Sequence, residues 1–391
     1  MKLSDRVEAL AESATLAVTA KAAQLKADGV DVVSFGAGEP DFDTPDNIKQ
    51  AAIRAINEGQ TKYSKPATGI APVKAAVCEK LARENELQYD PSQVIVTSGG
   101  KMACYLAIHA LINPGDEVII PVPYWVSYPE MVKLAGGVPV FLEGDENDSF
   151  KFSPAMLEKA ITPKTRMLIF NSPSNPGGFT YHPDEVDAIS KVVTNHDMVV
   201  LADEIYDRLR YGGQGFKSFA ATSAKAYEQT LTLIGASKTY SMTGWRAGYV
   251  AGPQAIINAM AKLQSQSTSG ACTFVQHGLV EALTGDQSEV EKMRVEFEKR
   301  AEHIHHRLTA LPGVSCNKPT GAFYAFPNVS RTYPKLGVSN SVEFSQVVLE
   351  KAHVAVVPGA AFGMDSCVRF SFACSMEQIN KGLDRLAEFL I

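Results

Sequence analysis

The sequence predicts an α/β protein with a doubly wound, mostly parallel sheet in a large domain, followed by a smaller α+β domain. Between about residues 90 and 270, short apolar runs rich in valine and isoleucine alternate with stretches of helical pattern. Strands that are apolar along their whole length are buried on both faces, and the intervening helices form the crossovers of a parallel sheet. After about residue 285, strands and helices follow one another without this alternation, which is typical of an α+β unit.

The expected strands and helices of the large domain follow one another closely. The turn at residues 113–116 (Asn-Pro-Gly-Asp) ends the first helix, and Ser153 with Pro154 gives a later helix its N-cap and first-turn proline. The predicted strands cover residues 93–98, 117–123, 138–143, 166–171, 198–204, 230–237 and 247–252. The predicted helices cover residues 99–112, 124–137, 155–161 and 184–193.

The smaller domain is expected to begin with a long charged helix over residues 286–311, about seven turns in length. Ser375 is a predicted N-cap for the last helix of the chain. The other predicted elements are strands over 321–329 and 367–373 and helices over 342–352 and 375–390.

The length of 391 residues favours two or three domains. We expect an N-terminal segment (1–45) that packs with the small domain, a large domain (46–285) that carries the site, and a small C-terminal domain (286–391). The net charge of −6 argues against a nucleic-acid-binding protein, which would carry a basic field.

The cysteines and the N-terminus indicate where the protein resides. Six cysteines are scattered without a C-x-x-C pair, so we expect reduced thiols that serve as small core residues. The first ten residues are charged and lack the apolar stretch of a signal peptide. No apolar run approaches the ~18 residues of a membrane span. A cytoplasmic enzyme is therefore expected.

Two glycine-rich segments superficially resemble nucleotide-binding motifs. "GAGEPD" has Asp41 in place of the third glycine of G-x-G-x-x-G, and "GGKM" has Met102 where a P-loop has serine or threonine. Neither segment therefore predicts a nucleotide site. What remains at Gly99-Gly100-Lys101 is a strand-to-helix turn whose backbone N–H groups form a generic anion site, or a simple helix start.

A cluster of histidines, His303, His305 and His306, could suggest a metal site. On a helix, however, residues i and i+2 face apart, and charged neighbours mark a solvated surface. We therefore expect these histidines to be structural and predict no metal.

Polar side chains gather at the ends of the predicted strands. Asp203 ends one strand, Tyr206 lies three residues on, Lys238 ends another, and Asn175 follows a third; Arg246 comes eight residues after the lysine. Open α/β sheets bind ligands at this edge. Together these residue types suit a phosphorylated, protonatable aromatic cofactor that forms a Schiff base with an amine.

Several of these segments occur together in a known family. "SKTYSMTGWRAGY" resembles the pyridoxal-phosphate (PLP) lysine motif of class I aminotransferases, and further segments match in order: "FGAGEPDFDTP", "TKYSKPATGI", "PYWVSYPEM", "SPSNPGG", "ADEIY" and "VRFSFA". The resemblance covers essentially the whole chain and is greatest to bacterial enzymes of the aspartate and aspartate/prephenate subgroup. It implies the fold-type-I architecture of PLP-dependent transferases.

The resemblance assigns the cofactor's reacting end to five residues. Lys238 would hold PLP as a Schiff base and then move the proton between the substrate Cα and the cofactor. Asp203 would keep the pyridine nitrogen protonated, so that the ring accepts electrons. Asn175 and Tyr206 would hydrogen-bond the ring oxygen, and Trp125 would stack on the ring.

The resemblance places the cofactor's phosphate on a second group of residues. Arg246 and the backbone of Gly100 and Lys101 would bind it, with Ser237 as a further ligand. Tyr63 would reach the phosphate of a neighbouring subunit, which implies a homodimer with shared active sites.

The substrate is assigned to a third group. Arg369 would bind its α-carboxylate through a bidentate contact, helped by the Gly38 N–H, with Trp125 and Asn175 beside it. The better-known relatives bind the distal carboxylate with an arginine from the partner, but the corresponding stretch here, "SQSTSGACTF", contains none. The subgroup uses instead a lysine at the position of Lys101. Thr15 matches a position that the subgroup ties to prephenate.

Other departures from the family pattern concern specificity. Gly235 stands where many relatives have a serine that contacts the phosphate, and Ala11-Glu12 stand where some have Lys-Pro.

The implied activity is that of an aspartate aminotransferase acting on aspartate and 2-oxoglutarate. The alternatives are a prephenate or aromatic aminotransferase, a lyase acting at Cβ, and a transcription regulator built on the same fold. The last would carry a basic helix-turn-helix region where this chain already shows the aminotransferase pattern.

Overall fold

The computed structural model describes residues 2–10 and 14–391, except for the side chains of residues 14–17 and 19. A central sheet of seven strands has the order β2-β8-β7-β6-β5-β3-β4. Strand β8 runs antiparallel to both of its neighbours, and the other pairs are parallel. The strands are β2 (Val94–Thr97), β3 (Glu117–Val122), β4 (Val138–Glu143), β5 (Thr165–Asn171), β6 (Val199–Asp203), β7 (Thr230–Gly235) and β8 (Gly248–Ala251).

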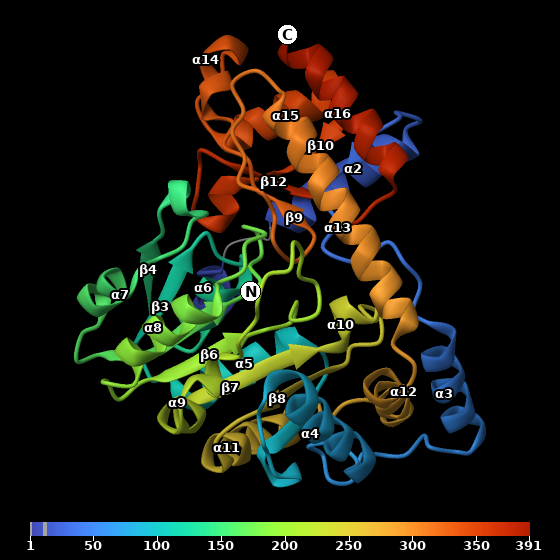
Figure 1. Cartoon of the computed structure of the whole chain (residues 1–391), viewed down its shortest axis with the longest axis vertical. Coiled ribbons are helices and arrows are strands. Elements are labelled where there is room, and N and C mark those ends of the chain that lie inside the picture. Colours follow the sequence, from blue (N-terminus) through green and yellow to red (C-terminus); the bar gives the residue numbers. More distant parts are fainter. Residues whose placement is uncertain (1, 11–13) are drawn as a thin grey trace.

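Helices surround this sheet (Figure 1). Several of its strands are fully buried, which fits a sheet covered on both faces and confirms the predicted α/β class. The helices are α3 (Asp46–Asn57), α4 (Ala71–Asn85), α5 (Gly100–Leu111), α6 (Ser127–Leu134), α7 (Pro154–Ala160), α8 (Pro183–Val193), α9 (Ala224–Gln229), α10 (Ala236–Thr239), α11 (Gln254–Ser265) and α12 (Thr273–Thr284).

A second group of elements lies at the other end of the molecule (Figure 1). Two small sheets occur there, one of β1 with β10 and one of β11, β12 and β9. The strands are β1 (Val33–Ser34), β9 (Tyr324–Ala325), β10 (Val354–Ala355), β11 (Val357–Pro358) and β12 (Val368–Ser371). The helices are α13 (Ser288–Thr309), α14 (Tyr333–Leu336), α15 (Ser341–Ala352) and α16 (Met376–Leu390), together with the N-terminal α2 (Ala14–Ala27). The short first helix, α1 (Asp5–Glu8), lies instead against α6 of the large sheet region.

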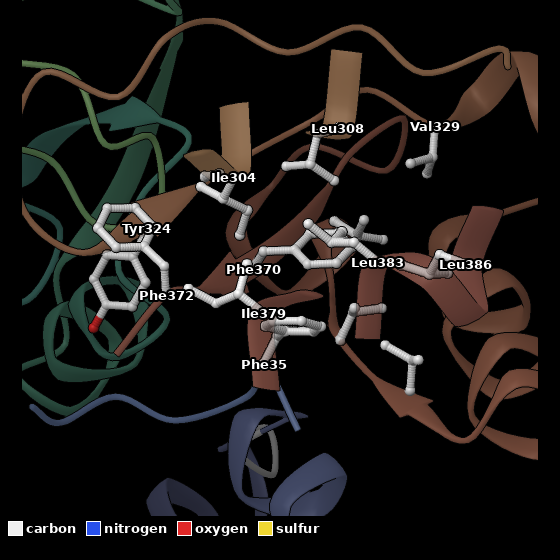
Figure 2. Close-up of a cluster of buried hydrophobic side chains, with 14 of the residues drawn as sticks. Phe35, Ile304, Leu308, Tyr324, Val329, Phe370, Phe372, Ile379, Leu383 and Leu386 are labelled. Carbon is white, nitrogen blue, oxygen red and sulfur yellow. The ribbon is translucent and has the colours of Figure 1, made fainter. Parts of the chain in front are cut away.

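The core of this second group joins distant parts of the chain. Figure 2 shows Phe35 from the segment after β1 among side chains of α13, β12 and α16. Phe35 and Phe370 contact one another, with ring centroids 5.2 Å apart. Because Phe35 is fully buried there, the chain is anchored in this core immediately before it crosses to α3.

Several predicted boundaries are wrong by a few residues. Helix α13 spans Ser288–Thr309, about six turns instead of seven, since Asp286 accepts hydrogen bonds from Ser288 and holds the preceding residues outside the helix. Helix α6 starts only at Ser127, because the Tyr124 N–H donates to the carbonyl of Phe362 instead of joining a helical turn. Trp125 therefore precedes the helix.

Two predicted strands are also shorter than expected. The strand predicted over 321–329 is reduced to Tyr324–Ala325, because its backbone pairs in turn with Leu209, Ser315 and Phe372. The strand predicted over 230–237 ends at Gly235, and the chain then turns into the short helix α10. The N-caps predicted at Ser153 and Ser375 are confirmed.

Candidate active site

The carboxyl ends of three neighbouring parallel strands bring the main candidate residues together. In the sheet, β6 lies between β5 and β7. Asp203 is the last residue of β6, Asn175 follows β5 by four positions, and Lys238 follows β7 by three. Since parallel strands end at the same edge, these side chains meet there although the asparagine and the lysine are 63 positions apart in the chain.

The Asp203 carboxylate is buried and held from two sides. The Tyr128 hydroxyl donates to Oδ2 at 2.6 Å, and the Ile205 N–H donates to Oδ1 at 3.3 Å. Burial raises the pKa of Asp203, while both hydrogen bonds and the nearby Lys238 act in the opposite direction. The carboxylate is therefore oriented, and a cation placed against it would offset its desolvation.

Tyr128 is a site residue that the sequence motifs did not single out. It lies on α6, is almost fully buried, and contacts the Trp125 ring edge-on at 5.2 Å between centroids. Its presence as the second tyrosine of "PYWVSYPEM" is the only indication of a role that the sequence gives. Its hydrogen bond to Asp203, 75 positions away, is seen only in the folded structure.

The amine of Lys238 lies in a setting that weakens its basicity. Its Nζ donates a hydrogen bond to the Gly38 carbonyl. Burial, together with the positive charges of Arg369 and Arg246, lowers the pKa of Lys238 to about 8, against the opposite influence of Glu39 and Asp203. The neutral amine is therefore far more accessible near neutral pH than that of an ordinary lysine. Such an amine is an activated nucleophile.

Arg369 is a buried guanidinium on β12 without a carboxylate partner among the described residues. Its Nη1 donates to Asn175 Oδ1 and its Nη2 to the Gly36 carbonyl, both at 3.1 Å, while the buried Nε has no partner. The group lies over the Tyr324 ring at 4.5 Å. A buried cation that contacts only neutral groups is well suited to bind an anion, and a planar guanidinium favours a carboxylate.

Tyr206 lies beside this arginine. Its hydroxyl is 3.2 Å from that of Tyr324, in a hydrogen bond that either group can donate. Burial, with the neighbouring hydroxyl and Asp203, raises the pKa of Tyr206 well above its usual value. The phenol is therefore neutral near pH 7 and can donate a hydrogen bond.

A glycine turn at the start of α5 forms the third part of the site. Gly99 has a φ of +88°, and a Cβ there would lie 2.5 Å from the Arg246 guanidinium. Only glycine permits both the backbone conformation and this close approach. Gly100 opens the helix, so the free N–H groups of its first turn and Arg246 together form an anion-binding cradle. Ser237 is buried on α10, next to Lys238.

A cavity of about 630 Å³ adjoins this turn. It shares Lys101 and Arg246 with the turn and continues along α6 past Tyr124 and Phe141. The Lys101 ammonium lies 5.0 Å from the centroid of the Trp125 ring. Burial and the charge of Arg246 lower the pKa of Lys101, so an anion near this lysine would be favoured.

Some candidate residues lie away from this group. The Tyr63 side chain is 81% exposed on the surface. Thr15 is in α2, but its side chain is outside the described part of the structure, as are Ala11 and Glu12 entirely.

The histidines have structural partners. His303 hydrogen-bonds Asn380 at 2.6 Å, and His305 contacts the Cys316 carbonyl at 3.1 Å. Within residues 2–10 and 14–391, no three histidine, cysteine or acidic side chains gather as metal ligands, and no helix is long and apolar enough to cross a membrane. All six cysteines are unpaired.

Comparison with known proteins places this arrangement in a family. Residues 30–386 match the model of "Aminotransferase class I and II". The chain belongs to this family. The aspartate aminotransferase of Bacillus subtilis (strain 168) is 47% identical over 390 residues, which cover 100% of this chain and 99% of that protein. The aspartate/prephenate aminotransferase of Nitrosomonas europaea is 46% identical over 397 residues, with 100% of both chains covered.

Solved structures of the family superpose closely on this aminotransferase. The aspartate aminotransferase of Thermus thermophilus with maleate has a TM-score of 0.94 and 43% identity, with 100% of both chains covered. The enzyme from Rhizobium meliloti gives a TM-score of 0.96 at 38% identity, covering 100% of this chain and 99% of the other. The family and fold-type-I architecture predicted from the sequence are therefore confirmed.

Proposed function

We propose that this aminotransferase is a PLP-dependent aspartate aminotransferase, which moves the amino group of L-aspartate to 2-oxoglutarate in a ping-pong exchange and yields oxaloacetate and L-glutamate. The observation that carries the proposal is that Lys238, Asp203 and Asn175 follow the same ends of three neighbouring parallel strands, with the buried Arg369 guanidinium hydrogen-bonded to Asn175. Its near relatives are named for aspartate, and membership of the aminotransferase family implies PLP, a carbonyl cofactor that the Lys238 amine can bind.

The residues of the site fit PLP. The phosphate would occupy the cradle of Gly100, Lys101 and Arg246, with Ser237 beside it, because that cradle offers N–H donors and a guanidinium at a helix start. Asp203, fixed by Tyr128, would hold a proton on the pyridine nitrogen. When bound, PLP supplies an electron-accepting ring that stabilises the charge left as the substrate Cα loses its proton.

The chain's own groups around the ring would orient it. Asn175, whose Oδ1 accepts from Arg369, would donate from its Nδ2 to the ring oxygen, as would the neutral Tyr206 phenol, and Trp125 would lie against the ring face. Tyr63 of a second copy would contact the phosphate in a homodimer, and its exposed side chain is available for that contact.

The substrate amino acid would be bound and deprotonated by two groups. Arg369 would bind the α-carboxylate through its forked donors, assisted by the Gly38 N–H. Lys238 in its neutral form would accept the proton from the substrate Cα and pass it to the cofactor. Its lowered pKa makes that neutral form available near neutral pH.

The proposal is tested by mixing the holoenzyme with single amino acids and following the cofactor absorbance in the first half-reaction. We expect aspartate and glutamate to react at least about tenfold faster than phenylalanine, alanine or cysteine, because only the first two carry a second carboxylate. A tenfold difference corresponds to ~1.4 kcal/mol, the size expected of one further charged contact. A preference for phenylalanine would favour the aromatic alternative, and release of product without conversion of the cofactor to its amine form would favour a lyase.

The distal carboxylate requires a further cation, and we assign this role to Lys101. Its side chain lines the cavity beside the phosphate turn, and its ammonium lies against the face of the Trp125 ring. A cation at a helix N-terminus is unfavourable by itself, which also favours a compensating anion.

We therefore expect Lys101→Ser to lower kcat/KM for aspartate and glutamate by about ten- to a hundredfold, or ~1.4–2.8 kcal/mol for one charge-assisted contact. Steady-state rates with alanine serve as the internal control and should change little. Equal losses for aspartate and alanine would show that Lys101 serves the cofactor or the fold.

Prephenate is the second candidate substrate. Several relatives, including the Nitrosomonas protein, are named for both aspartate and prephenate. The cavity beside Lys101 has aromatic and apolar walls that include Tyr105, Tyr124 and Phe141. An ammonium is a compact point charge, so it imposes a less strict geometry on a bulky second acid than a guanidinium does.

A further inference from the structure

Residues 36–44 cross from β1 to α3, and we call this segment the crossing loop. It contacts both cations of the proposed chemistry through backbone carbonyls: Gly36 accepts from Arg369 Nη2 at 3.1 Å, and Gly38 accepts from Lys238 Nζ. The position of the crossing loop therefore determines what the reacting amine touches.

One side of the crossing loop is bound to the segment after Lys238. Glu39 accepts a hydrogen bond from the Thr243 hydroxyl at 2.6 Å, and Thr44 donates to the Ser241 carbonyl at 2.6 Å. The Glu39 contact is exposed, so water competes with it and it constrains the loop weakly.

The other side is bound to α13 by a buried arginine. Arg300 Nη1 lies 2.7 Å from Asp41 Oδ1, and its Nε lies 3.0 Å from Glu296. Its guanidinium lies 5.0 Å from the Phe42 ring centroid and 5.5 Å from that of Phe297. The side chain of Arg300 is only 6% exposed.

This pair is well suited to fix the loop. Loss of one carboxylate partner from a buried guanidinium is unfavourable, so the burial of Arg300 favours keeping its contact to Asp41 in addition to that with Glu296. The two rings and Glu296 leave the guanidinium little freedom of its own. Only Glu39 and Pro40 lie between Gly38 and Asp41, and the proline has a fixed φ.

We propose that Asp41 and Arg300 form a positioning pair that holds the Gly38 carbonyl against the Lys238 amine and the Gly38 N–H where the substrate carboxylate binds. The inference rests on the proposed role of Lys238 as the reacting amine. Neither residue touches the reacting atoms, so both act through the crossing loop.

The test compares Asp41→Asn, Arg300→Met and the double variant, first without cofactor. The apoenzyme is treated with an amine reagent at a series of pH values, and peptide mapping measures how much of Lys238 is labelled at each pH. This pH dependence reports the protonation of the Lys238 amine alone. The charged groups facing it are Arg369 of β12, Arg246, Asp203 of β6 and Glu39 of the crossing loop, and none is altered.

The two substitutions have opposite direct electrostatic effects on Lys238. Removing a negative charge lowers the pKa of a nearby amine, and removing a positive charge raises it. Displacement of the Gly38 carbonyl, by contrast, removes a hydrogen bond to the charged form and lowers the pKa in both variants. We expect both single variants and the double variant to lower the labelling midpoint by about 0.5–1 pH unit.

The holoenzyme gives a second readout. We expect kcat/KM for aspartate to fall about 5- to 20-fold in each single variant and no further in the double variant, since residues acting as one unit are not additive. The control is Arg307→Met with Asp384→Asn, an Arg–Asp pair at 2.5 Å that joins the same helix α13 to α16 instead of to the crossing loop. These control variants should retain the parent values.

Shifts of opposite sign, absence of any shift, or additive losses in kcat/KM would overturn the proposal. If Arg300→Met does not fold, Arg300→Lys takes its place, with a smaller shift in the same direction expected. The labelling measurement uses the apoenzyme, so it distinguishes failure of this inference from failure of the proposed function, which Lys238→Ala tests separately.

Discussion

Lys238→Ala is expected to lose turnover with aspartate by at least about a thousandfold while retaining the fold and the bound cofactor. One amine is proposed both to hold the cofactor and to move the Cα proton, and general acid–base catalysis alone contributes about 10²–10⁴-fold. The cradle of Gly100 and Arg246 is untouched, so phosphate binding should persist. Turnover is measured by coupled assay and cofactor content by absorbance after gel filtration.

Chemical trapping checks the same assignment in the parent protein. Borohydride reduction of the holoenzyme followed by peptide mapping should label Lys238. Lys292→Ala is a suitable control, because that side chain is exposed and pairs with Glu289 on the surface of α13; it should keep full activity and labelling. Labelling of any other lysine would refute the assignment of the reacting amine.

Asp203→Ala is expected to slow the chemical step by at least about a hundredfold with a much smaller effect on cofactor retention. Without the carboxylate, nothing holds a proton on the pyridine nitrogen, and the ring accepts charge poorly. The substitution also leaves the Tyr128 hydroxyl without its 2.6 Å acceptor. Single-turnover absorbance changes with aspartate measure the chemical step directly.

The neighbouring carboxylate provides a matched control. Glu204 is as deeply buried, but it accepts hydrogen bonds from Ser218 and the Phe219 N–H, away from Lys238. Burial raises its pKa to about 7, so a neutral side chain is already accessible there. Glu204→Gln should therefore keep near-parent single-turnover rates. Near-parent rates in Asp203→Ala would show that the electron-accepting role is wrongly assigned.

The positions of the central candidates follow from local sequence patterns. Apolar runs mark β5, β6 and β7, and polar residues just beyond them must lie at one edge of a parallel sheet. These patterns alone predict that Asp203, Lys238 and Asn175 are neighbours. The family motifs extend the assignment to Arg369 and Arg246.

The exact ends of helices and strands could not be predicted as well from the sequence. The backbone of residues 321–329 has the composition of a strand, yet only Tyr324–Ala325 pair as one, because the surrounding partners come from three separate segments. Likewise, the start of α6 depends on the Phe362 carbonyl, which is remote in the chain. Hydrogen-bond partners outside the segment decide such boundaries, and local propensity does not contain them.

Fold class, family and strand-end residues can all be predicted from the amino-acid order, because hydrophobic periodicity and short motifs are local properties. The contacts, burial and pKa values of the site residues depend instead on how the folded chain packs. The Tyr128 contact to Asp203, the burial of Arg369 beside Asn175 and the Gly38 carbonyl at Lys238 join residues 75 to 200 positions apart. Burial and opposing charge set the pKa values of these groups, and both depend on which distant segments pack around them.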